Sequence, residues 1–160
     1  MNQIKMEIDI LDFIKTGKFG VLKLGDSKQE IINQGFPPED WLNGETKESS
    51  RIWRYGNIEL HFDNLNDLSG IFTDYVSHID CGESISISNW WILRNGKTIP
   101  DLLSTIKELN RLNLDYTKTT FDLGYIELTL SNKVYFLFDH PDEKPDEEQN
   151  KWTMTVIGKK

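Results

Sequence analysis

Three polar side chains at alternate positions are the clearest candidates for acid–base chemistry in this sequence. Glu59, His61 and Asp63 fall at every second residue, so on a β-strand they share one face. A histidine between two carboxylates has the residue types of a general acid or base. Strand faces carry such solvated polar groups routinely, and we favour that interpretation.

Other residues with reactive side chains show no recognisable arrangement. The single cysteine, Cys81, follows His78 by three residues, which pairs a nucleophile with a base in sequence only. No family signature surrounds it, so we expect a free, partly buried thiol. The three histidines have none of the spacings of a zinc motif, and the glycines near the N-terminus lack a phosphate-loop pattern. The sequence therefore predicts no catalytic residue, no metal and no cofactor.

The five tryptophans exceed what a small core needs, and two of them are adjacent. On a strand, the side chains of Trp90 and Trp91 point to opposite faces. One of them is therefore expected at the surface, as an anchor for a binding partner. The alternative is that helices or a second sheet bury both.

The strongest local charge lies in residues 139–148, where six carboxylates surround one lysine. Such a run is usually a solvated loop, but its field is also suited to steering a basic partner. Together with the two tryptophans, the predicted partner-binding residues are Asp142, Glu143, Asp146, Glu147 and Glu148.

Three helices are expected to support these residues. One occupies 7–16, and a second starts at Ser27, which forms a capping box with Glu30 and must end by Gly35. The third is predicted over 100–112, after a cap at Thr98 and Pro100. Its apolar residues recur three and four positions apart and make one stripe: Leu102, Leu103, Ile106, Leu109 and Leu112.

Alternating apolar residues predict the strands. An antiparallel meander is expected over 51–55, 57–63, 68–75 and 84–93, and four further strands over 116–121, 125–130, 134–138 and 152–157. The fold class is therefore α+β, with short helices packed on an antiparallel sheet in a single domain, 1–160.

The order of helix and then strands occurs twice, which suggests half-repeats at 1–95 and 96–160. The pattern G-x-I-E-L occurs at 56–60 and again at 124–128. A match this short also arises by chance, so a true structural repeat and a coincidence both remain open.

Composition limits the class of protein. The chain has 160 residues, of which 38% are hydrophobic, and a net charge of -8, so it can form a packed core. The negative charge makes nucleic acid and anionic membranes unlikely partners. Without an apolar leader or a membrane-length apolar run, we expect a cytoplasmic location.

Several segments of the first half resemble a known family pattern. They are KFGVLKLGDSKQEI at 18–31, GFP at 35–37, IWRYG at 52–56 and IELHF at 58–62. In order, they resemble the small helix-plus-sheet domain of outer-membrane-assembly lipoproteins and the repeats of β-lactamase inhibitor protein. They are also similar to cytosolic immunity proteins of bacterial polymorphic toxin systems. The resemblance covers roughly 7–75 and implies helices laid on a curved antiparallel sheet, with no catalytic residues to transfer.

These observations favour a non-enzymatic immunity protein that binds and neutralises a cognate toxin domain. The acidic balance complements a basic toxin, such as a nuclease, and the surplus aromatics supply interface anchors. Two alternatives remain: a general interaction or scaffold domain, and a small hydrolase that uses His61 with Glu59 and Asp63.

Overall fold

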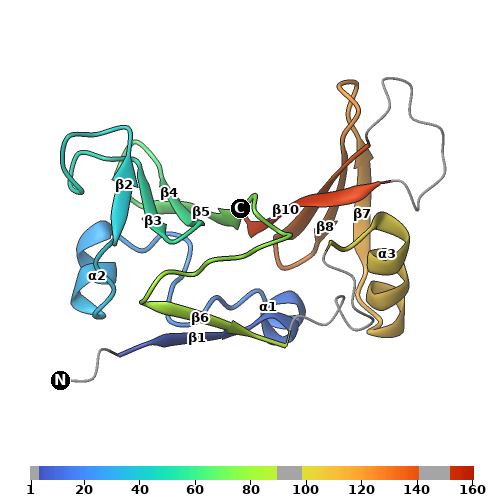
Figure 1. The fold of residues 1–160 in the computed structure, drawn as a ribbon, viewed down its shortest axis with the longest axis horizontal. Helices are drawn as coiled ribbons and strands as arrows, with labels where there is room; N and C mark the ends of the chain where they lie inside the picture. The colour runs from blue at the N-terminus through green and yellow to red at the C-terminus, as the bar shows by residue number, and fades with distance from the viewer. Residues whose placement is uncertain (1–3, 90–98, 141–151) are drawn as a thin grey trace.

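The architecture is a bent antiparallel sheet with all helices on one side of it. The computed structural model describes residues 4–89, 99–140 and 152–160. Within them the helices are α1 (Ile10–Thr16), α2 (Lys28–Asn33) and α3 (Leu102–Arg111). The two ends of the sheet rise on the same side in Figure 1, while the helices lie on the opposite, convex side. The expected α+β class, with helices on an antiparallel sheet, is confirmed.

The large sheet has eight strands in the order β2-β3-β4-β5-β10-β9-β8-β7. Its N-terminal half-sheet consists of β2 (Asp40–Leu42), β3 (Ile52–Tyr55), β4 (Ile58–Phe62) and β5 (Leu68–Thr73). Its C-terminal half-sheet consists of β7 (Tyr116–Thr120), β8 (Ile126–Leu130), β9 (Val134–Asp139) and β10 (Thr153–Lys159). Each half is an antiparallel meander preceded by a helix, and the last strands of the two halves, β5 and β10, pair at the centre.

The repeated pattern G-x-I-E-L does not fall on equivalent strands of the two halves. Its first copy begins β4, the third strand of its meander, whereas its second copy begins β8, the second strand of its own. The order of elements therefore repeats, but this short sequence match does not follow that order.

The expectation of one helix over 7–16 was wrong in its first part. Met6–Asp9 forms β1, in which alternate side chains are buried, and only then does α1 begin. Asp9 is the cap: its Oδ1 accepts the backbone N–H of Asp12 at 3.0 Å. Asp is a preferred cap residue, so the sequence itself carries a signal for this start.

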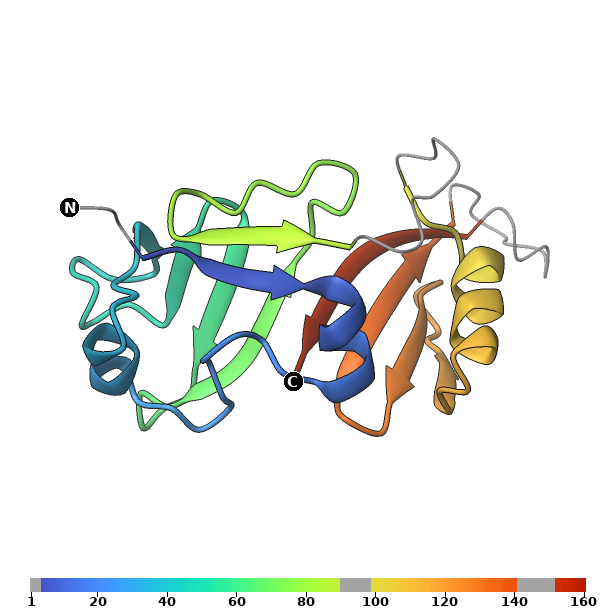
Figure 2. The same cartoon turned by 90° about the horizontal axis from the view of Figure 1, so that it is seen from below.

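The strand predicted over 84–93 does not continue the meander. Its described part, β6 (Ile85–Ser88), pairs in parallel with β1 and forms a separate two-stranded sheet. In Figures 1 and 2 this pair runs beneath the convex side of the large sheet, next to α1. The pairing buries Met6, Ile8 and Ile85, because this layer, together with α1, covers the convex face of the large sheet.

The third helix forms as predicted, but its cap and buried face differ. Asp101 caps it, since its side chain accepts the backbone N–H of Ser104 at 2.7 Å. Leu102 and Leu109 are fully buried, whereas Leu103, Ile106 and Leu112 are half-buried. The residue expected at mid-stripe, Ile106, therefore lies at the edge of the contact.

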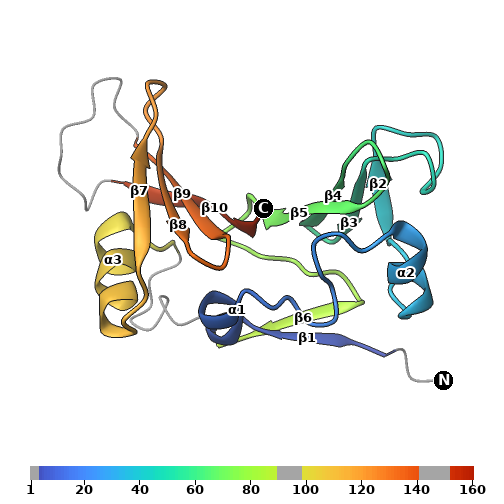
Figure 3. The same ribbon diagram turned by 180° about the vertical axis from the view of Figure 1, so that it is seen from behind.

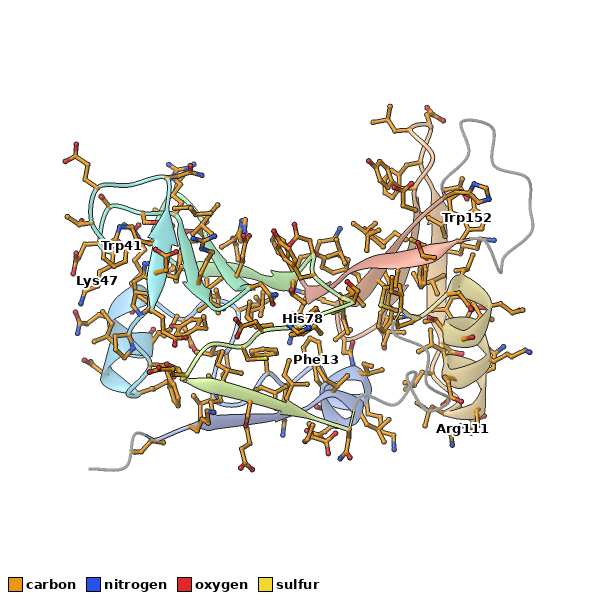
Figure 4. All side chains as sticks on the ribbon, viewed as in Figure 1. Phe13, Trp41, Lys47, His78, Arg111 and Trp152 are labelled. Atoms are coloured by element: carbon orange, nitrogen blue, oxygen red, sulfur yellow. The ribbon has the colours of Figure 1, made fainter. Side chains whose placement is uncertain are left out.

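The core fills the space between the sheet and the β1–β6 layer. Phe13 of α1 lies there in Figure 4, and its ring meets that of Phe19 edge-on, with centroids 5.3 Å apart. From the sheet above, Trp53 and Tyr55 are fully buried. Their polar atoms are satisfied because Trp53 Nε1 donates to Lys47 O at 2.7 Å and the Tyr55 hydroxyl donates to Phe36 O at 2.6 Å. Burial, with a smaller effect of Glu39, raises the pKa of Tyr55.

Within the described residues, no helix has the length and apolar character needed to cross a bilayer.

Candidate functional site

The side of the sheet on which the described residues place no helix is the candidate site, and we call it the concave face (Figure 3). Strand pairing places one residue from each of the eight strands in a single register row across it. This central row runs, in order, through Asp40, Arg54, Glu59, Phe72, Gly158, Tyr135, Thr129 and Thr117. Because side chains alternate along a strand, their neighbours face the core and these residues face away from it.

At the middle of the central row, the close pairing of β5 with β10 requires a glycine. At Gly158 a Cβ atom would lie 2.5 Å from both Ile71 O and Phe72 Cβ. Strands β5 and β10 therefore pair with Phe72 beside a position that has no side chain. The concave face is continuous across the two half-sheets because of this contact.

On the N-terminal half-sheet, a carboxylate contacts a histidine, and the histidine contacts an aromatic ring. Glu59 Oε2 lies 2.8 Å from His61 Nε2, and the His61 ring lies over Phe72 with centroids 4.6 Å apart. The side chains of Glu59 and His61 are 19% and 34% exposed. This group, which we call the β4 triad, is therefore in contact with solvent.

A second group of the same kind lies on the C-terminal half-sheet. Lys160 Nζ lies 4.5 Å from the centroid of the Tyr135 ring and donates to Glu127 Oε2 at 2.9 Å. The other oxygen of Glu127 accepts from the Thr129 hydroxyl at 2.8 Å. Burial, followed by the charge of Glu127, raises the pKa of Tyr135 to about 12. We call Glu127, Lys160 and Tyr135 the β8 triad.

The edge of the N-terminal half-sheet adds a paired arginine and a shallow depression. Arg54 forms an ion pair with Asp40 on the neighbouring strand, which lowers the pKa of that carboxyl. The depression beside this pair is lined also by Glu59, Tyr75 and Asp80. Tyr75 is 59% exposed, so an aromatic surface borders the charged groups.

The acid–base cluster predicted from sequence is only partly assembled. Glu59 and His61 do meet, but Asp63 lies in the turn after β4, where its Oδ1 accepts the backbone N–H groups of Leu65 and Asp67 at 2.8 and 3.1 Å. Asp63 therefore shapes a turn rather than joining the histidine.

Cys81 is a half-buried free thiol, and among the described residues no hydrogen bond joins it to the His78 side chain. Burial, with Asp80 next in effect, raises the pKa of Cys81 to about 11. Such a thiol is protonated at neutral pH and is a poor nucleophile. No group of three or more metal-ligating side chains occurs among the residues described.

The residues predicted to bind a partner lie outside the described residues. These are Trp90, Trp91, Asp142, Glu143, Asp146, Glu147 and Glu148. Of the tryptophans that the structure describes, Trp53 and Trp152 are buried and Trp41 is half-buried against the core. Figure 4 places Trp41 on β2 and Trp152 at the start of β10, at opposite ends of the molecule.

Sequence reasoning missed Phe72, Tyr135, Lys160 and Arg54 as surface candidates. One signal was available, since the two G-x-I-E-L segments supply Glu59 and Glu127, the carboxylates of the two triads. Phe72, Tyr135 and Lys160 come from other segments of the chain, so no local pattern links them to these glutamates.

No match to this chain was found among protein-family models, curated proteins or solved structures. The resemblance to immunity and lipoprotein domains therefore stays a prediction from the quoted residues.

Proposed function

We propose that this chain is a non-enzymatic immunity protein that neutralises a cognate toxin domain by covering its active or substrate-binding surface. The observation that carries the proposal is the central row on a concave sheet face that the described helices leave uncovered. A concave sheet accepts a convex ridge of a partner, and its aromatic and ionic groups provide the contacts that specify the partner.

The polar groups of the concave face support a protein partner. The Arg54 side chain is 33% exposed beside Asp40, so its guanidinium can also contact a carbonyl or carboxylate of a partner. Phe72 is the half-buried ring of the β4 triad and offers an apolar contact at the centre of the row. Such a mixture of a central apolar group and flanking charges is typical of interfaces.

Charge supports a basic toxin domain, for which a nuclease is the natural example. The chain has 26 acidic and 18 basic residues, which favours fast association with a basic surface. We expect Trp90 or Trp91 to add an anchor, and the acidic residues of 142–148 to raise the association rate more than they slow dissociation.

The test begins with the neighbouring gene. If the adjacent upstream gene encodes a secreted protein with a toxic C-terminal domain, co-expression of this chain should restore growth and the two purified domains should form a stable complex. Growth that is not restored, together with no complex, would reject the immunity function. A stable complex with a non-toxic partner would instead indicate a scaffold domain.

Two variants on one strand then test whether the partner binds the concave face. Thr117 and Thr120 of β7 are both exposed, but they point to opposite faces of the sheet. Thr117→Arg should weaken the complex and Thr120→Arg should not. Phe72→Ala should cost about 1–4 kcal/mol of binding energy if the ring is a central anchor. Equal binding by both threonine variants would place the interface elsewhere.

A small hydrolase is a second candidate because Glu59 and His61 are in contact at 2.8 Å. It ranks below binding because the third predicted member, Asp63, lies in a turn. Loss of a measured turnover in His61→Ala, with retention of fold, would establish this candidate over immunity function.

A further inference from the structure

A cleft rich in lysines lies on the side of the molecule away from the concave face. The loop after α1, the turn between β8 and β9, and the end of β10 enclose it; these segments lie side by side in Figures 1 and 2. Lys18, Lys23, Lys133 and Lys159 line it, and we call it the lysine cleft. Because consecutive strand residues alternate, Lys159 points away from the face that carries Lys160.

The walls of the lysine cleft are tied together by hydrogen bonds between distant segments. Lys159 Nζ donates to Gly17 O at 2.7 Å, and Asn132 Nδ2 donates to Ile14 O at 2.9 Å. Gly17 caps α1 at φ 73°, and a Cβ atom there would lie 3.0 Å from Asn132. The loop and the turn are thus in direct contact, so the cleft is part of the packed structure.

The charge of the lysine cleft opposes that of the rest of the chain. No Asp or Glu lines it, although the chain carries a net charge of -8. Asp26 belongs to the same loop, but its carboxylate accepts the backbone N–H of Lys23 at 2.9 Å. Within the described residues, no ion pair is formed by the ammonium groups of Lys18, Lys23 or Lys133.

Two of these lysines repel each other. Burial and then the charge of Lys133 lower the pKa of Lys159. Like charges held together are stabilised by a bound anion, because each ammonium group then gains an opposite charge. Ser131 adds a hydroxyl group to the lining, which can donate to the same anion.

We propose that the lysine cleft binds a small oligophosphate anion, of the class that runs from pyrophosphate to a nucleoside triphosphate. Lysine binds phosphate as a point charge, and four lysines match a ligand with several negative charges. A small ligand is favoured over a nucleic acid because the positive charge is confined to the cleft, while the whole chain would be repelled by a long polyanion. This site is separate from the concave face and goes beyond the proposed toxin binding.

Calorimetric titration of the full chain with inorganic tripolyphosphate and with ATP tests this proposal. Tripolyphosphate should bind saturably at physiological ionic strength, and more weakly as salt is raised. Lys18→Gln with Lys133→Gln should reduce affinity at least about tenfold, since two charge-assisted contacts are lost. The matched control, Lys107→Gln with Lys118→Gln, removes the same charge at exposed positions on α3 and β7 and should bind as the wild type does.

Circular dichroism checks that each variant folds, and Lys23→Gln provides a second, single change in the cleft. Equal affinities for tripolyphosphate and ATP would support recognition of the phosphate chain alone; tighter binding of ATP would support a nucleotide. The proposal is overturned if wild type shows no saturable binding of either ligand, or if the control pair loses as much affinity as the cleft pair.

Discussion

The two half-sheets place the same kinds of group on the concave face in different ways. In the β4 triad, Glu59 and His61 are two residues apart on one strand, and both are partly exposed. In the β8 triad, Glu127 is 10% exposed, and its partners come from β9 and from the residue after β10. A carboxylate, a basic side chain and an aromatic ring thus meet twice, once through local spacing and once through long-range pairing.

This difference indicates which half-sheet needs the assembled sheet to bring its polar groups together. Glu59 and His61 would share a face on any β4 strand, so their pairing needs little beyond the strand itself. Glu127 and Lys160 meet only when β8, β9 and β10 are paired in register. We therefore expect changes on the C-terminal half-sheet to affect stability more than matched changes on the N-terminal half-sheet.

The largest effect is expected where α3 supports the C-terminal half-sheet. Leu109 is fully buried, so Leu109→Ala should lower the free energy of unfolding by about 2–5 kcal/mol. Ile106 is half-buried, and Ile106→Ala should cost less than half as much. Urea unfolding measures both. Equal losses would mean that the helix packs on the face that its sequence stripe indicated.

The next effect concerns the contact that joins the halves. Gly158→Ala would place a Cβ atom against the backbone and side chain of β5, and we expect a loss of about 1–3 kcal/mol in unfolding free energy. Gly70 on β5 is the control, because its Cβ atom would meet nothing closer than 3.7 Å. Gly70→Ala should change stability by less than about 0.5 kcal/mol. If both variants unfold at the same urea concentration, close packing at Gly158 does not hold the halves together.

A smaller effect distinguishes the two triads. Glu127→Gln keeps an acceptor for Thr129 but removes the charge beside Lys160, and should cost about 1–2 kcal/mol. Glu59→Gln removes a more exposed charge and should cost less than about 1 kcal/mol. Thermal and urea unfolding of the pair provide the comparison. A larger loss for Glu59→Gln would reverse the order proposed for the half-sheets.

The smallest expected effect on stability belongs to Cys81, and it is measured through the reactivity of its thiol. The pKa of Cys81 is raised from 9.0 to about 11, so less thiolate is present at pH 8 in the folded chain than in the unfolded chain. Alkylation by iodoacetamide at pH 8 should be at least about tenfold slower in buffer than in urea. Because the fold favours the neutral thiol, its contribution to stability is present below about pH 9 and declines toward pH 11. Equal alkylation rates in both solvents would show that Cys81 is not shielded.

Elements with a strong local signal were predicted well from sequence. The capping box of Ser27 and Glu30 is present, with Ser27 N donating to Glu30 Oε2 at 2.7 Å. Strands β3, β4 and β5 and the four strands of the C-terminal half-sheet appear near their predicted places, since their apolar residues alternate, whereas β2 was not predicted. The β1 strand was missed because a four-residue strand followed at once by a helix presents a mixed period.

The candidate site was predicted poorly because it depends on neighbours that are remote in sequence. Glu59 and His61 were recognised as a pair, whereas Phe72 joins them only through the pairing of β4 with β5. Tyr135 and Lys160 gave no sign of a shared role, because 25 positions separate them along the chain. The tryptophans and carboxylates predicted to bind a partner were chosen by residue type, and residue type does not say where the fold places a side chain.

By itself, the sequence determined the fold class, most of the elements and the charge of the chain, because caps, turns and apolar alternation act over a few residues. The tertiary structure alone decided that β6 joins β1, that β5 meets β10 at Gly158, and that four lysines converge in an acidic protein. These outcomes depend on which surfaces remain to be buried once the local elements exist. That choice is a property of the whole chain, since each buried face is completed by residues far away in sequence.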